Sequence, residues 1–253
     1  MRVGDSPWRG VGKTRHTIYV THKTPSPLTN HRRESLFFVG CKHASGQSDD
    51  TNVTQQIWNH FDGLNVFRRG STQVMRYWHQ LPSEVVNGKT RVLAVCRTLA
   101  YLFEHDSGTC EAWANFFGHT LLVQGIEPQL YGVTLKPYED PTHGDLEMDW
   151  LMIKEWTERT DNGVRIVEAG QTAAAQGVQN NSPHSHDSHA VVILGNTIYD
   201  PSYGLVLTTT AGAAAAYEAM AFWGYTYHTV GGASITAKDR AGVTDTNWEP
   251  KPW

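Results

Sequence analysis

One cysteine of this chain stands where a thiol gains reactivity. Residues 106–128 read DSGTCEAWANFFGHTLLVQGIEP and pass from small polar residues into a strongly apolar run, with Cys110 at the boundary. Thr109 suits the N-cap of a helix over about residues 110–124, and Gly125 suits its C-terminal end. The first backbone N–H groups of a helix have no partner within it, and the helix dipole favours negative charge beside them. A thiol at this place therefore loses its proton more easily, and the same N–H groups can hold an oxyanion.

A reactive thiol needs a base, and the 13 histidines of the chain offer several candidates. Without a base, a free cysteine is ordinarily a small buried hydrophobe. His119 falls on the far side of the same helix. His105 is separated from Cys110 by a short loop, and nothing else in the sequence supports a partnership. His189 is better placed, because it opens a run that is typical of a β-hairpin.

The hairpin reads HAVVILGNTIYDP from His189 onward and turns at Gly195-Asn196. With this two-residue turn, His189 and Asp200 lie on the same face as diagonal neighbours whose side chains can meet. The face is otherwise apolar, so the carboxylate needs a partner, and His189 supplies it. Together with Cys110, the two have the residue types of a nucleophile, a base and an orienting group. Taken singly, His189 is a histidine at a strand start and Asp200 a turn residue, and a one-residue slip would separate them.

The rest of the chain predicts an α+β fold with an antiparallel sheet, because helical patterns come first and strand patterns follow. The polar ends, residues 1–15 and 239–253, are expected to be irregular. Apolar periodicity predicts helices over residues 51–61, 90–105 and 211–225, besides the one that begins at the cysteine. Runs of β-branched and aromatic residues predict strands over residues 16–23, 34–42, 128–136, 149–157 and 163–170 and within 189–204.

The cysteine and histidine segments resemble those of transglutaminase-like domains. Residues 108–114 read GTCEAWA, and Gly125-Ile126 ends the same helix, as in the cysteine segment of that family. His189-Ala190 at a strand start and Asp200-Pro201-Ser202 soon after it resemble the family's histidine and aspartate segments, in the same order. The resemblance covers roughly residues 90–205.

This resemblance implies a papain-like fold in which a helix with an N-terminal cysteine packs on an antiparallel sheet. It implies that Cys110 is the nucleophile, His189 the base and Asp200 the orienting group. The family often continues Gly-Ile-Pro-Ala-Arg, where this chain has Glu127-Pro128, and often has an aromatic residue where this chain has Val191. These differences bear on the substrate class. An arylamine-acetyltransferase-like enzyme also uses these three residue types, but the glycine-rich surroundings of its cysteine are missing here.

The residue patterns and, for the catalytic core, this resemblance set the expected layout of the chain. We expect residues 1–253 to form one domain, with a strand pair at 16–45. A transglutaminase-like catalytic core follows at 90–205, and a helix and tail at 206–253 end the chain. The second donor of an oxyanion hole is not evident. Trp78 and Gln80 are candidates, because an indole N–H or an amide can donate; ordinary packing or surface exposure is the alternative for both.

Composition narrows the class of protein. The chain has 253 residues and a net charge of −4, so a nucleic-acid partner is not expected. No run of about 18 apolar residues is present, so we expect no membrane partner, and the missing leader sequence favours the cytoplasm. Three cysteines, an odd number, do not form a disulfide framework.

Two other motifs suggest chemistry. GVGKT at residues 10–14 is similar to a phosphate-binding loop, but that pattern requires glycine where Pro7 stands. The run HSHDSH gives a zinc site as an alternative. A histidine-rich surface loop is the other interpretation of that run, and we expect neither a metal nor a cofactor. The candidate ligands of such a zinc site are His184, His186, Asp187 and His189.

The sequence therefore predicts a cysteine-dependent acyl-transfer enzyme that acts on amide bonds of a protein or peptide through a thioester. With water as acceptor it is a protease or deamidase, and with an amine it is a transferase. A non-catalytic binding module on the same fold, using the surroundings of Trp113 and Trp223, is the alternative from another class.

Overall fold

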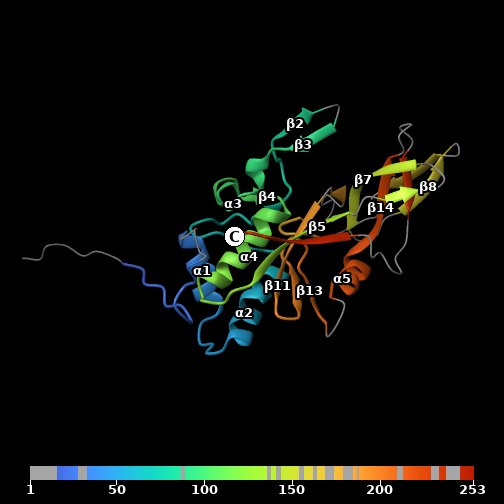
Figure 1. The fold of residues 1–253 in the computed structure, drawn as a ribbon. Coiled ribbons are helices and arrows are strands. Elements are labelled where there is room, and N and C mark those ends of the chain that lie inside the picture. Colours follow the sequence, from blue (N-terminus) through green and yellow to red (C-terminus); the bar gives the residue numbers. More distant parts are fainter. Residues whose placement is uncertain are drawn as a thin grey trace, which may run out of the picture.

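The structure is a computed structural model and shows an α+β fold, as the sequence predicts. Figure 1 shows the helices α1 to α4 gathered at one end and the strands β7, β8 and β14 at the other. The described residues are 16–27, 33–86, 89–135, 138–140, 144–153, 157–161, 164–168, 174–178, 185–186, 188–209, 213–228, 234–237 and 246–253. In that part of the chain, no helix is both long and apolar enough to cross a membrane.

The helices and strands have the following bounds. The helices are α1 Glu34–His43, α2 Asp50–Asp62, the 3-10 helix η1 Ala94–Arg97, α3 Leu99–His105, α4 Cys110–Leu122 and α5 Ala213–Ala221. The first strands are β1 Arg76–Tyr77, β2 Ser83–Val86, β3 Lys89–Val92, β4 Ser107–Gly108, β5 Gln129–Leu135, β6 Tyr138–Asp140, β7 Gly144–Ile153 and β8 Thr157–Asp161. The others are β9 Val164–Glu168, β10 Ser185–His186, β11 Ser188–Leu194, β12 Thr197–Asp200, β13 Leu205–Thr208, β14 Phe222–His228, β15 Ser234–Ala237 and β16 Thr246–Lys251.

Helix α4 lies at the centre of the hydrophobic core. Apart from Glu111 and Asn115, all of its residues are buried. It packs against α1, α2 and α3 and against strand β11. Aromatic rings fill the contact with α2, where Phe61 meets Trp113, Phe116 and Phe117 edge to face. Such burial fixes the helix, and therefore the position of its first residue.

One five-stranded antiparallel sheet packs on α4, with the strand order β13-β12-β11-β5-β16. Its β11–β12 hairpin has the register that the sequence predicts, with Leu194 opposite Thr197 and Val192 opposite Tyr199. The turn residue Gly195 has a φ of +57°, a conformation that suits glycine. The predicted pairing therefore places His189 and Asp200 on one face.

A second sheet extends from the first, with the strand order β10-β7-β14-β15 and β6 beside β7. Strands β5 and β7 are in contact, and Figure 1 shows β7 and β14 beyond the end of β5, far from α4. The pairs β2–β3 and β8–β9 are separate hairpins.

The predicted N-terminal strand pair at 16–45 is wrong. Residues 16–23 form no strand, and residues 34–43 form helix α1 instead of the strand predicted over 34–42. Leu36, Val39 and Gly40 are buried at helical spacing. Gly40 faces α4, where the side chain of Gln124 approaches so closely that a Cβ atom would collide with it. Packing on α4 thus overrides the β propensity of the aromatic and β-branched residues.

Three further predictions need correction. The single helix predicted over residues 90–105 is divided into β3, η1 and α3, because the chain is extended at Leu93 and at Thr98, which caps α3. The tail predicted to be irregular contains strand β16, which pairs with β5. The helix predicted over residues 211–225 ends at Ala221, where strand β14 begins. The helix predicted over 51–61 is confirmed as α2, with Asp49 as its N-cap.

Candidate active site

Cys110 is the first residue of α4, as the sequence predicts. Thr109 occupies the N-cap position with extended backbone, although its side chain makes no capping hydrogen bond to the helix. Gly108 is required here, because a Cβ atom would come within 2.9 Å of the Cβ of Ala112. The side chain of Cys110 faces strand β11, and its Sγ lies 3.9 Å from the carbonyl oxygen of Ser188, a distance suited to a weak S–H···O contact. Cys110 is 6% exposed.

His189 and Asp200 form a buried ion pair on the neighbouring strands. Nε2 of His189 lies 2.9 Å from Oδ2 of Asp200, and both side chains are fully shielded from solvent. Since Nε2 faces the carboxylate, Nδ1 is the nitrogen left for the thiol. Burial lowers the pKa of His189, but the charge and hydrogen bond of Asp200, together with the hydrogen bond and charge of Cys110, raise it to about 10. The three residues that the sequence singles out are therefore brought together in a row.

Three further donors hold the carboxylate of Asp200. The backbone N–H groups of Ser202 and Tyr203 donate to Oδ1 at 3.1 and 3.4 Å, which is the local turn that an aspartate favours. The hydroxyl of Tyr217, from helix α5, donates to Oδ2 at 2.6 Å. Oδ2 thus receives both His189 and Tyr217, so the carboxylate is kept charged and its orientation is fixed. Gly204 closes the turn with a φ of +62° against the backbone of Asp62.

A layer of tyrosines surrounds the ring of His189. The ring of Tyr203 lies 5.7 Å from it and 5.2 Å from the ring of Tyr77. Tyr77, Tyr203 and Tyr217 are buried, and burial raises the pKa of each phenol well above its usual value, so all three stay neutral. Such a wall keeps water from the His189–Asp200 pair and strengthens its charge interaction.

Gln176 joins this layer to the turn after Asp200. Its side-chain amide donates to the carbonyl oxygens of Phe61 at 2.6 Å and Pro201 at 2.7 Å. Its backbone pairs with Ser202 on one side and Tyr77 on the other. Gln176 and the three tyrosines are the residues that our sequence reasoning missed. Only Tyr217 gave a signal, as the single aromatic residue within the alanine run of its helix.

Trp78 and Gln80 lie beside the start of α4. Both have positive φ values, 53° and 51°, and the backbone N–H of Trp78 donates to the carbonyl of Gly108, two residues before the cysteine. The side chain of Trp78 is partly buried against the core, and that of Gln80 is exposed. The backbone of Trp78 thus contacts the segment that leads to the thiol, and the role of Trp78 and Gln80 as oxyanion donors stays a prediction.

The other histidines near the motif lie apart from the thiol. His119 is buried on α4, where its ring meets that of Trp253 at 5.4 Å. His105 is exposed, and its ring lies 4.1 Å from the ring of Tyr101, tilted by 36°. Of the other candidate zinc ligands, His184 and Asp187 lie outside the described residues, and only the backbone of His186 is described. Among the described residues, no three His, Cys, Asp or Glu side chains are grouped as a metal site requires.

Comparison with protein-family models, with curated proteins and with solved structures finds no match to this chain. The resemblance to transglutaminase-like domains therefore rests on its residues alone. Independently of any family, the arrangement has a thiol at a helix start, an imidazolium beside it and a carboxylate behind the imidazolium. This order of groups is able to generate a thiolate and to protonate a leaving group.

Proposed function

We propose that this protein is a cysteine-dependent acyl-transfer enzyme that acts on amide bonds of a protein or peptide, of the transglutaminase-like type. The observation that carries this proposal is the 2.9 Å contact between His189 and a fully buried Asp200, with the Sγ of Cys110 directed at the same strand, 3.9 Å from the carbonyl oxygen of Ser188 next to that histidine. A charged imidazole that is fully buried and backed by a carboxylate is the partner that a cysteine nucleophile requires.

In the first half of the reaction, the thiolate of Cys110 attacks the carbonyl carbon of the amide. A C–S bond forms and the carbonyl oxygen becomes an oxyanion, for which the free N–H groups at the start of α4 are suitable donors. His189, as imidazolium, gives its proton to the amide nitrogen. The C–N bond then breaks, and ammonia or an amine leaves behind a thioester on Cys110.

In the second half, neutral His189 takes a proton from water or from a primary amine as that molecule attacks the thioester. The C–S bond breaks, the new acid or amide leaves, and the thiolate–imidazolium pair is restored. Asp200 accepts the Nε2–H bond throughout and stabilises the imidazolium. The three cysteines are free, and a reducing cytoplasm would maintain Cys110 as the thiol that this cycle needs.

The test is ammonia release from a glutamine-rich protein, measured with and without an added primary amine. We expect ammonia release that is lost in Cys110→Ser and retained in Cys41→Ser. Cys41 lies on α1, where it accepts a hydrogen bond from the side-chain amide of Gln124, beyond the opposite end of α4. Incorporation of the amine would identify a transferase, and release without incorporation a deamidase. Peptide cleavage without ammonia would identify a protease. No acyl transfer in any of these assays would favour the binding module. Trp113, however, is wholly buried and offers no surface for a partner.

A further inference from the structure

A polar cleft of about 740 Å³ lies beside the segment that leads to the thiol. Its walls come from the end of α2 with the loop after it, from the loop and strand around β1, from the end of α3, and from residues 174–178. The side chains that can contact a ligand in it include Asn65, Gln73, Arg76, His79 and Gln80. Cys110 itself does not line the cleft, so the cleft is a neighbouring site and not the reaction centre.

The cleft carries a positive charge without a matching carboxylate. Among the described residues that line the cleft, the one acidic side chain is Asp106, and it is already paired with Arg68, whose Nε and Nη2 lie 2.6 and 3.3 Å from the two carboxylate oxygens. Arg76 is exposed, and its Nη1 donates to Nε2 of His79 at 3.0 Å. Among the described residues, no carboxylate lies within ion-pair distance of Arg76. The guanidinium is thus oriented by a ring nitrogen and not by a carboxylate, and it is available to an anion.

The register of two short strands limits how far the backbone of Arg76 is from the backbone of Cys110. Strand β1 runs parallel to β4, with Arg76 opposite Ser107. Paired strands lie about 4.8 Å apart, and the three residues from Ser107 to Cys110 span about 10 Å at most. The Cα atoms of Arg76 and Cys110 are therefore within about 15 Å of each other. An extended peptide covers this distance in three to five residues at about 3.3 Å each.

We propose that this cleft binds an acidic side chain of the peptide substrate, three to five residues away from the amide that Cys110 attacks. This inference rests on the proposed function for the peptide nature of the ligand, and on Arg76 for its charge. A carboxylate is the group that a guanidinium fork matches, with two parallel N–H···O bonds. The carboxylate of Asp106 is neutralised by Arg68, so it does not compete with the carboxylate of the substrate for Arg76.

Binding is tested separately from chemistry in a Cys110→Ala background. The probes are two fluorescent peptides, each with one glutamine and with either aspartate or serine three to five residues away on both sides. We expect the acidic peptide to bind about two- to fivefold more tightly, which is the range of a partly exposed ion pair, and the difference to shrink as salt is added. Adding Arg76→Gln should abolish the preference.

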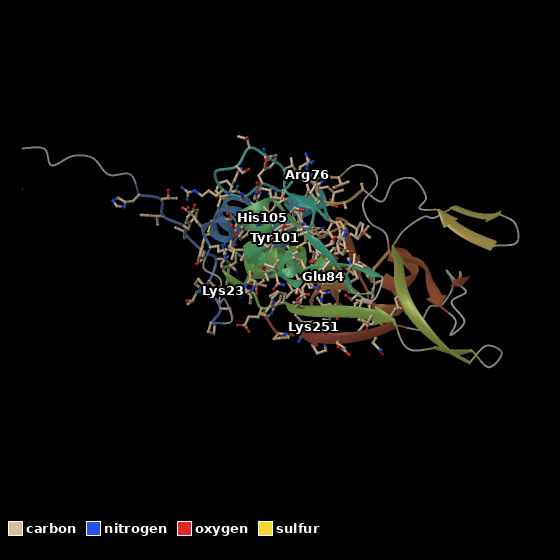
Figure 2. All side chains as sticks on the ribbon, turned by 90° about the horizontal axis from the view of Figure 1, so that it is seen from above. Lys23, Arg76, Glu84, Tyr101, His105 and Lys251 are labelled. Carbon is tan, nitrogen blue, oxygen red and sulfur yellow. The ribbon has the colours of Figure 1, made fainter. Side chains whose placement is uncertain are left out.

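Lys251→Gln is the matched control, because it removes one exposed positive charge at a distance from the cleft. Figure 2 labels Arg76 and Lys251 on opposite sides of the helical core. In the described part of the chain, the one ion pair of Lys251 is with Glu249, two residues before it. This variant should keep the preference for the acidic peptide. Equal binding of the two peptides, or a preference that survives Arg76→Gln, overturns the proposal.

The same peptides distinguish this inference from the proposed function. If wild-type protein releases ammonia from both peptides at equal rates, the acyl-transfer proposal is supported and the proposed preference of the cleft for an acidic side chain is wrong. If the acidic peptide is bound through Arg76 but neither peptide reacts, the cleft is real and the acyl-transfer proposal fails.

Discussion

Replacement of Asp200 by asparagine removes one charge from the centre of the candidate site while its shape is almost preserved. The amide oxygen can keep the N–H bonds of Ser202 and Tyr203 that the carboxylate oxygen receives now. The NH₂ group then faces His189 and Tyr217, where an acceptor stood before. The imidazole must turn an unprotonated Nε2 toward it, so the remaining proton sits on Nδ1, the side of the thiol.

The magnitude follows from the pKa of His189, which the site raises from 6.5 to about 10. Each unit is a factor of ten, so the surroundings favour the imidazolium by about 3 × 10³-fold, or about 5 kcal/mol. Asp200 supplies the largest favourable part of this, and burial opposes it. Without the carboxylate, the lowering of the His189 pKa by burial is no longer offset by Asp200, and the imidazolium beside the thiol is lost at pH 7.

The assay is alkylation by iodoacetamide near pH 6, with the rate at each cysteine followed by mass spectrometry. In the wild-type protein Cys110 should react fastest, even though Cys41 is more exposed to the reagent. Cys96 is buried, like Cys110. Burial raises the pKa of both of these other thiols. In Asp200→Asn, labelling of Cys110 should slow by about 10³-fold, while labelling of Cys41 in the same molecule should not change.

Cys41 thus serves as an internal control, and circular dichroism with a thermal melt shows whether the variant is folded. A folded variant in which Cys110 still reacts at the wild-type rate would contradict the dependence of the thiol on His189 and Asp200. It would mean that the thiol owes its state to the start of the helix alone, and not to the charged imidazole.

The remaining predictions concern stability and the support of the site. Because the pKa of His189 is raised to about 10, its protonation stabilises the folded state fully below pH 6.5, and this effect is lost as the pH rises toward 10. The free energy of unfolding should therefore fall by about 2 kcal/mol between pH 7 and 8.5. Urea titrations measure this fall, and His189→Gln should make it much smaller. Tyr217→Phe removes a hydrogen bond to a buried charge and should lower the free energy of unfolding by about 1–3 kcal/mol and slow alkylation of Cys110; an unchanged melt would contradict the bond. Gly118→Ala should destabilise the fold by about 1–3 kcal/mol, because a Cβ atom would collide with the ring of Trp253, and the loss should disappear in a Trp253→Ala background.

The central hairpin and the cysteine helix were predictable because local rules determine both. A two-residue turn at Gly195 fixes the register of β11 and β12, and that register alone brings His189 and Asp200 together. The start of α4 follows from a change in polarity at Thr109. In both cases the residues that decide the structure are adjacent in the chain.

The sequence predictions were wrong, or missing, where contacts between residues far apart in the chain determine the structure. Helix α1 has the composition of a strand, and it is helical because Leu36, Val39 and Gly40 pack against α4. Strand β16 is polar and has Pro250, yet it pairs with β5 along its whole length. Gln176 lies in a polar loop that resembles any other, and only the three-dimensional structure shows its bonds to Phe61 and Pro201. No local pattern encodes such partners.

Support for the candidate site extends beyond the residues that resemble transglutaminase-like domains, which end near 205. Tyr217, on α5, donates a hydrogen bond to Asp200. Its neighbour Glu218 accepts a hydrogen bond from the indole N–H of Trp248 at 2.9 Å. Trp248 belongs to β16, the edge strand beside β5, and β5 in turn pairs with the strand that holds His189. The C-terminal segment therefore contacts both halves of the charged pair, one through α5 and one through the sheet. A site that must hold an imidazolium and a carboxylate in line needs such rigid support, and here the last strand of the chain supplies it.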